Sequence, residues 1–100
     1  MFDVVDACQH IPESGQSAAP QTRDGCQECL KTGSSWVHLR SCVECGKVGC
    51  CDDSPNKHAH AHYREHNDHR LIRSFEPGEA WWYCFEDNFG FEIEGTGPLR

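Results

Sequence analysis

Short apolar runs, separated by turn-forming residues, set the pattern along this chain. Residues 36–40 alternate between apolar and polar positions, and residues 71–75 form a short, largely apolar run, so both segments are predicted strands. Residues 81–85 and 89–93 are rich in aromatic side chains and flank a polar segment, which predicts a final hairpin. These segments are expected to form a small sheet.

One main helix is predicted between the strands. Ser54 can cap a helix and Pro55 suits its first position, so the helix is expected to begin there. It should end at Glu65 or His66, because an Asn-Asp pair follows. Strands that alternate with one helix indicate the α+β class.

The two flanks of this pattern lack regular periodicity. Residues 12–25 are rich in Ser, Ala, Pro and Gln, which is typical of a loop. A chain of 100 residues makes one domain. We therefore expect a single domain over residues 6–94, followed by a frayed, flexible tail over residues 95–100.

Composition narrows the range of partners and compartments. Arg and Lys number 9 against 16 Asp and Glu, a formal net charge of −7, whereas nucleic-acid binding needs a basic face. No stretch approaches the roughly 18 apolar residues of a membrane span. The first residues are acidic and unlike a signal peptide. We expect a protein of the reducing cytoplasm, with no nucleic-acid or membrane partner.

Cysteine carries the most informative chemistry. The chain has 8 Cys and 7 His, and so small a domain usually needs a metal or disulfides as staples. Two Cys-x-x-Cys turns, Cys26 with Cys29 and Cys42 with Cys45, are followed by Cys50. Such a turn presents two thiolates to one zinc ion at low cost to the backbone. A redox or disulfide role is the alternative, but neither pair has the strand-to-helix context of a thioredoxin-like motif.

The predicted helix carries matching histidines. His58, His62 and His66 are spaced by four residues, so they share one helix face and can present imidazoles to the Cys turns. His60 is expected at the surface, because each residue turns the helix by about 100°. His69 follows just beyond the predicted helix end. Thiolates from two turns and imidazoles from one helix therefore predict structural zinc.

Taken in order, these residues form a family pattern. The pattern spans residues 8–87 and comprises Cys8, His10, Cys26, Cys29, Trp36, Cys42, Cys45, Cys50, His58, His62, His69 and an aromatic segment around Cys84. It resembles the ubiquitin-protease-type zinc finger, and the stretches around residues 36–40 and 50–52 look like its stand-alone bacterial branch. The resemblance implies a twisted antiparallel sheet with one main helix packed against it, two zinc ions and space for a third.

The resemblance also implies how the ligands are divided. One zinc ion would be bound by Cys26, Cys29, Cys50 and His58. A second would be bound by Cys42, Cys45, His62 and His69, with His66 as a rival to His69 because the interval is one residue longer than usual. A third would take Cys8, His10 and Cys84, with Asp87, Cys51 or water as the fourth ligand, or would be empty.

In the eukaryotic relatives a pocket takes the free C-terminal Gly-Gly of ubiquitin. Trp36 matches its aromatic wall, and Tyr83 and Phe85 match its aromatic lids. Where the family has an Arg for the guest carboxylate, this chain has Asp52 and Asp53. A carboxylate would lose a charge-assisted hydrogen bond of roughly 1.5–3 kcal/mol. We therefore expect a peptide or protein partner that offers a cationic group.

Other functions remain to be weighed against this one. A binder of ubiquitin-like C-terminal tails is one alternative, and a structural or redox-sensing protein with an exposed, reactive Cys51 is another. Residues 62–66 match the His-x-x-Glu-His metalloprotease pattern, but two thiolate pairs compete for the metal of His62. We expect no enzyme activity and no catalytic residue.

Overall fold

The computed structural model describes residues 17–93 and 96–99. Over these residues two helices and a five-stranded antiparallel sheet form, in the strand order β2-β1-β3-β4-β5. The elements are α1 (Gln27–Thr32), β1 (Leu39–Cys42), β2 (Val48–Cys50), α2 (His58–Glu65), β3 (Leu71–Ser74), β4 (Trp82–Cys84) and β5 (Phe89–Phe91). The predicted α+β class is confirmed. No helix of this described part is long and apolar enough to cross a membrane.

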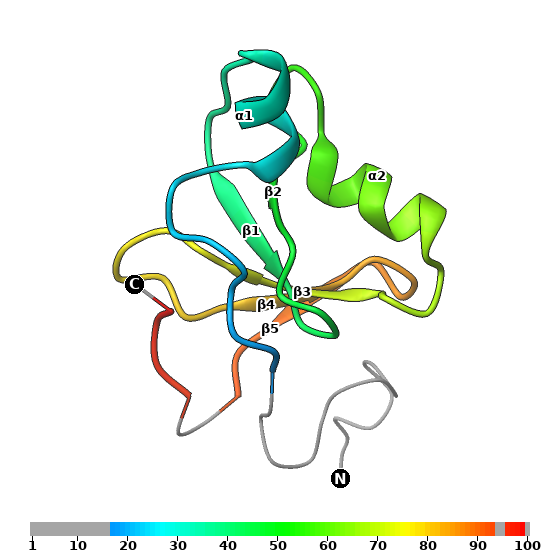
Figure 1. Cartoon of the computed structure of the whole chain (residues 1–100). Helices are drawn as coiled ribbons and strands as arrows, with labels where there is room; N and C mark the ends of the chain where they lie inside the picture. Colours follow the sequence, from blue (N-terminus) through cyan, green and yellow to red (C-terminus); the bar gives the residue numbers. More distant parts are fainter. Residues whose placement is uncertain (1–16, 94–95, 100) are drawn as a thin grey trace, which may run out of the picture.

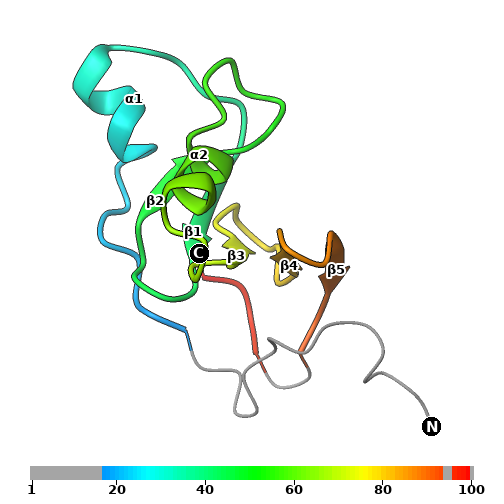
Figure 2. The ribbon, with the colours of Figure 1, turned by 90° about the vertical axis from the view of Figure 1, so that its right-hand side faces the viewer.

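Helix α2 packs on one end of the sheet. Figure 2 shows the strands side by side, with α2 beside β2 and β1, and Figure 1 shows α1 beyond them. Gly49 of β2 faces α2, where a Cβ atom would lie 2.7 Å from the backbone nitrogen of Ala59. Only a residue without a side chain lets the helix come so close to the strand.

The opposite face of the sheet is covered by irregular chain. The Arg73 side chain is 6% exposed there, and its guanidinium lies 4.5 Å from the centroid of the Trp82 ring. It donates hydrogen bonds to the Gly97 carbonyl at 2.6 Å and to Ser17 Oγ at 3.1 Å. Segments from both ends of the described chain thus meet over one buried cation. The domain boundary at residue 94 stays a prediction.

Several predicted boundaries differ from the structure. The first strand begins at Leu39 and not at residue 36. The Trp36 ring instead packs over Gly25, which has no side chain to block it, and against the neighbouring core. The helix begins at His58 and not at Ser54. The Ser54 hydroxyl is buried and accepts a hydrogen bond from the Val37 N–H at 2.8 Å, so it caps a loop.

Other boundaries agree with the sequence. The main helix ends at Glu65, as predicted, and β3 and the β4–β5 hairpin occupy the predicted segments. The turn after β1 ends at Gly46 with a φ of 81°, which a glycine adopts without strain. The periodicity gave no sign of α1 or β2, since each is only a few residues long.

Candidate metal centres

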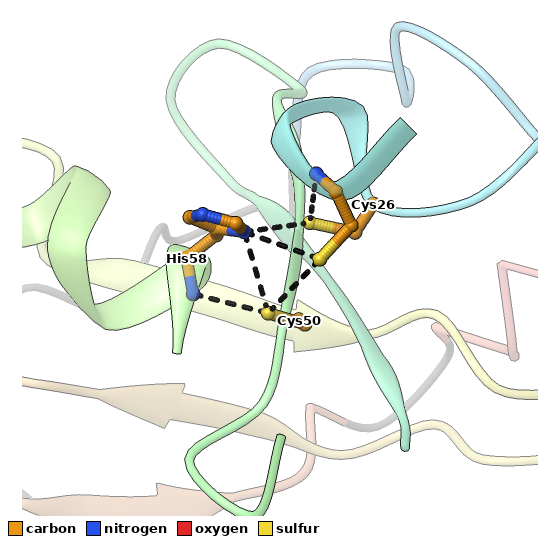
Figure 3. A group of neighbouring side chains, drawn as sticks. Cys26, Cys50 and His58 are labelled. Carbon is orange, nitrogen blue, oxygen red and sulfur yellow. Dashed lines mark hydrogen bonds between the residues drawn. The ribbon is translucent and has the colours of Figure 1, made fainter. Parts of the chain in front are cut away.

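The first cluster consists of Cys26, Cys29, Cys50 and His58. Cys26 is the N-cap of α1, and its thiol accepts the Cys29 N–H at 3.5 Å, so the Cys-x-x-Cys turn is also the start of a helix. Cys50 ends β2, and His58 begins α2. Figure 3 shows the His58 imidazole directed toward the sulfur atoms. Three elements therefore converge on one point.

The spacing within the first cluster fits zinc. A tetrahedral zinc ion with bonds of ~2.3 Å to sulfur and ~2.0–2.1 Å to nitrogen keeps its ligand atoms roughly 3.3–3.8 Å apart. His58 Nδ1 lies 3.2 Å, 3.3 Å and 3.6 Å from the Sγ atoms of Cys26, Cys29 and Cys50. The Cys29 and Cys50 Sγ atoms are 3.9 Å apart. The donors match a zinc ion in both type and separation.

The second cluster consists of Cys42, Cys45, His62 and His69. Cys42 and Cys45 flank the turn after β1, His62 lies within α2, and His69 precedes β3. The His62 Nε2 and His69 Nδ1 atoms are 3.3 Å apart. His62 Nε2 lies 3.5 Å from Cys45 Sγ, and His69 Nδ1 lies 3.6 Å from Cys42 Sγ. This set also fits one tetrahedral zinc ion.

His69, and not His66, joins the second cluster. His66 is exposed, although its ring lies beside those of both His62 and His69, with centroids 4.9 Å and 5.4 Å away. Helical spacing alone favoured His66. The turn after the helix instead brings the later histidine to the two thiols.

Burial decides the protonation of these ligands before a metal arrives. Burial raises the pKa of the Cys29 thiol to about 12, and that of the Cys42 thiol to about 11. Burial also lowers the pKa of His62, and the nearby His69 and His66 act in the same direction. Without a cation the thiols hold their protons, so zinc binding must displace them. The imidazole of His62, by contrast, is ready to coordinate at neutral pH.

The third candidate site lies largely outside the described residues. Cys8 and His10 belong to residues 1–16, so that site stays a prediction. Cys84 is fully buried, and its Sγ atom lies 3.7 Å from Asp87 Oδ2. The Asp87 N–H also donates to Cys84 Sγ at 3.5 Å. Of the rival fourth ligands, the structure brings Asp87 next to Cys84.

A cavity of about 190 Å³ lies between β4, β1 and α2. It is lined by Arg40, Cys51, Asp52, Asp53, Ala59, Ile72, Trp81, Tyr83 and Phe85. Trp36 was predicted to form its aromatic wall, but it is not among the lining residues and packs against the first cluster's core instead. Trp81 provides a wall in its place. The alternation of Trp81, Tyr83 and Phe85, which spans β4 and the residue on each side of it, was the sequence signal for this.

A cation also lines the cavity, which sequence reasoning missed. The Arg40 guanidinium lies 4.5 Å from the centroid of the Trp81 ring, and its Nη1 donates to the Leu39 carbonyl at 2.9 Å. Arg40 comes from β1, which is remote in sequence from the stretch after Cys50 where the cation was sought. The pairing of Arg40 with Ser74 in the sheet places Arg40 beside the cavity.

On the acidic side of the cavity, Asp52 contacts a side chain of α2. The Asp52 carboxylate lies 3.3 Å from His60 Nδ1, and the His60 ring stacks on Phe85 with centroids 4.6 Å apart.

Cys51 is 5% exposed, so the prediction of an exposed thiol is wrong. Burial raises the pKa of Cys51, but hydrogen bonds from Ser54, Asp53 and His38 outweigh it, and the pKa falls below its ordinary value.

Comparison with known proteins agrees with this geometry. A family model described as Zn-finger in ubiquitin-hydrolases and other protein matches residues 26–92. Protein RPA1320 from Rhodopseudomonas palustris, solved by solution NMR, is 44% identical to this chain, with a TM-score of 0.73. That match covers 83% of this chain and 79% of the other. No curated protein matches.

Proposed function

The chain belongs to the Zn-finger family of ubiquitin-hydrolases and other proteins, and from that premise we propose that it is a zinc-stabilised module that binds a peptide or protein segment in its cavity. The observation that carries the proposal is the row of Trp81, Tyr83 and Phe85 along the cavity. At about 190 Å³ the cavity is smaller than the ~300–1,000 Å³ of most small-molecule pockets, so it suits one or two residues of a chain.

The charge around the cavity favours a guest with a cationic group. Asp52 and Asp53 are exposed at its rim, and three aromatic rings line it. Aromatic faces attract cations, by roughly 0.5–1 kcal/mol at exposed sites and more when water is excluded. The net charge of −7 adds a long-range attraction for basic segments, and it supports a protein rather than a nucleic-acid partner.

Arg40 favours a second candidate, the capture of a ubiquitin-like C-terminal tail. Its guanidinium lies over Trp81 and can form a charge-assisted hydrogen bond with a carboxylate. The lining of the cavity therefore includes one cation, Arg40, and two carboxylates, Asp52 and Asp53. A tail whose carboxylate follows a basic residue could pair with both kinds of charge, whereas an internal basic segment would pair only with the carboxylates.

Three short peptides distinguish these candidates by NMR titration of the zinc-loaded protein. The first is basic with an amidated C-terminus, the second is the same peptide with a free carboxylate, and the third ends in Gly-Gly with no basic residue. We expect the basic amidated peptide to shift the amide signals of Asp52, Asp53 and Tyr83. If only the free carboxylates bind, tail capture is the function, and if no peptide shifts these signals, the cavity is not a peptide site.

A matched pair of variants tests the acidic rim. Asp53→Asn removes a carboxylate that lines the cavity, and Asp68→Asn removes an exposed carboxylate elsewhere. We expect Asp53→Asn to weaken binding of the basic peptide about tenfold, because a hydrogen bond to a charged group contributes ~1.5–3 kcal/mol. Equal effects of the two substitutions would mean that only the net charge matters.

We also propose that the module acts in the cytoplasm.

A further inference from the structure

The two clusters differ in how far solvent reaches their ligands. Cys26, Cys29 and Cys50 of the first cluster are each 0% exposed, and His58 is its one half-buried ligand. In the second cluster only Cys42 is buried to this degree, at 2% exposed, while Cys45, His62 and His69 are half-buried. A chelator or a thiol reagent must touch the metal or its ligands to displace them, so the second cluster offers the easier approach.

The first cluster also has more hydrogen-bond donors directed at its sulfur atoms. The His58 N–H donates to Cys50 Sγ at 3.1 Å, and the Asn56 side-chain amide lies 3.9 Å from Cys29 Sγ. The Cys29 N–H donates to Cys26 Sγ, as described above. Each of the three thiolates thus has a donor, which fixes its orientation and stabilises its charge. Such partners typically change metal affinity by about 10–100-fold.

The second cluster is less completely supported. The backbone N–H groups of Glu44 and Cys45 reach the Cys42 thiol. The Cys45 thiol meets the half-buried His62 ring, and the two imidazoles meet each other. Two thiolates balance the charge of a zinc ion, whereas the three of the first cluster bind it with an extra negative charge. The metal in the second cluster is therefore held by fewer anionic ligands in a more open setting.

The two metals also differ in what the fold needs from them. The first cluster joins α1, β2 and α2, and α1 has only 6 residues, too few to be stable alone. The second cluster joins the end of β1 to α2, through His62, and to the segment before β3. These parts have other connections: β1 and β3 already pair, with Cys42 opposite Ile72, and α2 packs on β2 and carries His58 of the first cluster. The sheet can persist when the second cluster empties, but α1 cannot stay in position when the first one does.

From these differences we propose that the second cluster holds an exchangeable zinc ion, and that the first cluster holds a zinc ion that stays with the fold. The chain would then have one structural metal and one metal that can be given up or replaced without unfolding. This division does not depend on what the cavity binds. It would let zinc availability change the molecule while leaving its sheet intact.

Chelation with time-resolved alkylation tests the proposal on the full zinc-loaded chain. EDTA is added, samples are pulsed with N-ethylmaleimide, zinc is counted by native mass spectrometry and the labelled cysteines are identified by peptide mapping. We expect a one-zinc species to accumulate, with Cys42 and Cys45 labelled about tenfold faster than Cys26, Cys29 and Cys50. Loss of both metals together, or earlier labelling of the first cluster, would overturn the proposal.

Two matched variants provide an independent measurement. Cys45→Ser removes a ligand of the second cluster, and Cys29→Ser removes a ligand of the first. We expect Cys45→Ser to bind one zinc ion and to keep the dispersed amide spectrum of a folded sheet. Cys29→Ser should lose that dispersion. If Cys45→Ser unfolds as completely as Cys29→Ser, both metals are structural and the proposal fails.

Discussion

Single residues decide which of several equivalent side chains reaches the metal. His66 and His69 offer the same imidazole, and helical spacing favours His66. However, His66 is the C-cap of α2 and has left helical geometry, with φ −134° and ψ 80°. The His69 N–H then donates to the His66 carbonyl at 2.8 Å, a tight turn that returns the chain toward His62. The backbone after the helix, and not the helix face, selects the ligand.

This selection predicts different effects for the two histidines. His69→Ala should lower the zinc content from two ions to one, because it removes a donor that lies 3.3 Å from His62 Nε2. His66→Ala, at an exposed ring, should leave two zinc ions bound. Native mass spectrometry of both variants measures this directly. The assignment is wrong if His66→Ala is the variant that loses the metal.

Two glycines separate the effects of backbone strain and steric clash. Gly46 and Gly78 have nearly the same φ, 81° and 80°. A Cβ atom at Gly46 would lie 2.0 Å from the Ala19 carbonyl oxygen, whereas at Gly78 nothing lies within 4 Å. Gly78→Ala should therefore cost about 1–2 kcal/mol of unfolding free energy, for the left-handed backbone alone.

Gly46→Ala should cost more than Gly78→Ala, since the segment near Ala19 must also move away from the turn. That segment is held by hydrogen bonds from Ala18 and Gln21 to the Val43 and Gly46 carbonyls, each 2.8 Å long. Urea unfolding of the two zinc-loaded variants compares the costs. Equal midpoints would indicate that residues 17–21 are not packed against the turn.

At the scale of the elements, the short ones depend on their surroundings. Helix α1 has one buried residue, Cys29, so its sequence has no apolar stripe from which the helix could be predicted. Its ends are set by the Cys26 thiol at the N-cap and by Gly33, with a φ of 72°, at the C-cap. Strand β2 is likewise only three residues long, and it is fixed by pairing with β1 and by the approach of α2. Both elements form because the first cluster and the sheet hold them.

The contact between β2 and α2 predicts a specific sensitivity at Gly49. Gly49→Ala places a methyl group 2.7 Å from a backbone atom, so helix and strand must separate. We expect a loss of about 1–3 kcal/mol of unfolding free energy, the usual cost of overpacking. Gly90→Ala in β5 is the control, because its nearest neighbour would lie at 3.6 Å, an ordinary contact. Thermal melts that fall equally for both variants would contradict this packing.

The whole molecule combines a small sheet with two metal clusters placed toward one side of it. Among the described residues, two hydrophobic core clusters lie apart, one around the first metal cluster with Phe75, and one around Trp82 with Leu71 and Val43. Neither group is large, which fits the expectation that a chain of this length needs staples. The metals join the helices to the sheet, while Arg73 joins the two ends of the described chain on the far face.

Acidification should weaken this assembly. The pKa of His62 lies below its ordinary value of about 6.5 in the folded chain, so the unfolded chain takes up that proton first as the pH falls. Stability from neutral His62 is complete above about pH 6.5, and it is lost as the pH falls toward the folded pKa. Protons also compete with zinc for the same nitrogen, which gives the same sign.

The measurement is the melting temperature of the zinc-loaded protein between about pH 7.5 and pH 5. We expect a progressive fall, with a slope of at most about 1.4 kcal/mol per pH unit for each proton taken up. A melting temperature that rises on acidification would contradict the assignment of His62.

The sequence by itself determined the donor types and most of their grouping. A Cys-x-x-Cys turn brings two thiols together within four residues, and a helix brings His58 and His62 to one side, so covalent proximity fixes these relations. The alternation of apolar residues likewise gave β3 and the final hairpin. Local geometry was sufficient for these features because each depends on residues that are close neighbours in the chain.

Only the tertiary structure decided the features that join distant segments. Trp81 and not Trp36 lines the cavity, and Arg40 supplies its cation, because strand register and the loop before β1 set their positions. The choice of His69, the approach of α2 at Gly49 and the burial of Cys51 depend in the same way on how loops pack. Spacing along the chain carries no information on such contacts, since they arise only when the sheet and helices have assembled.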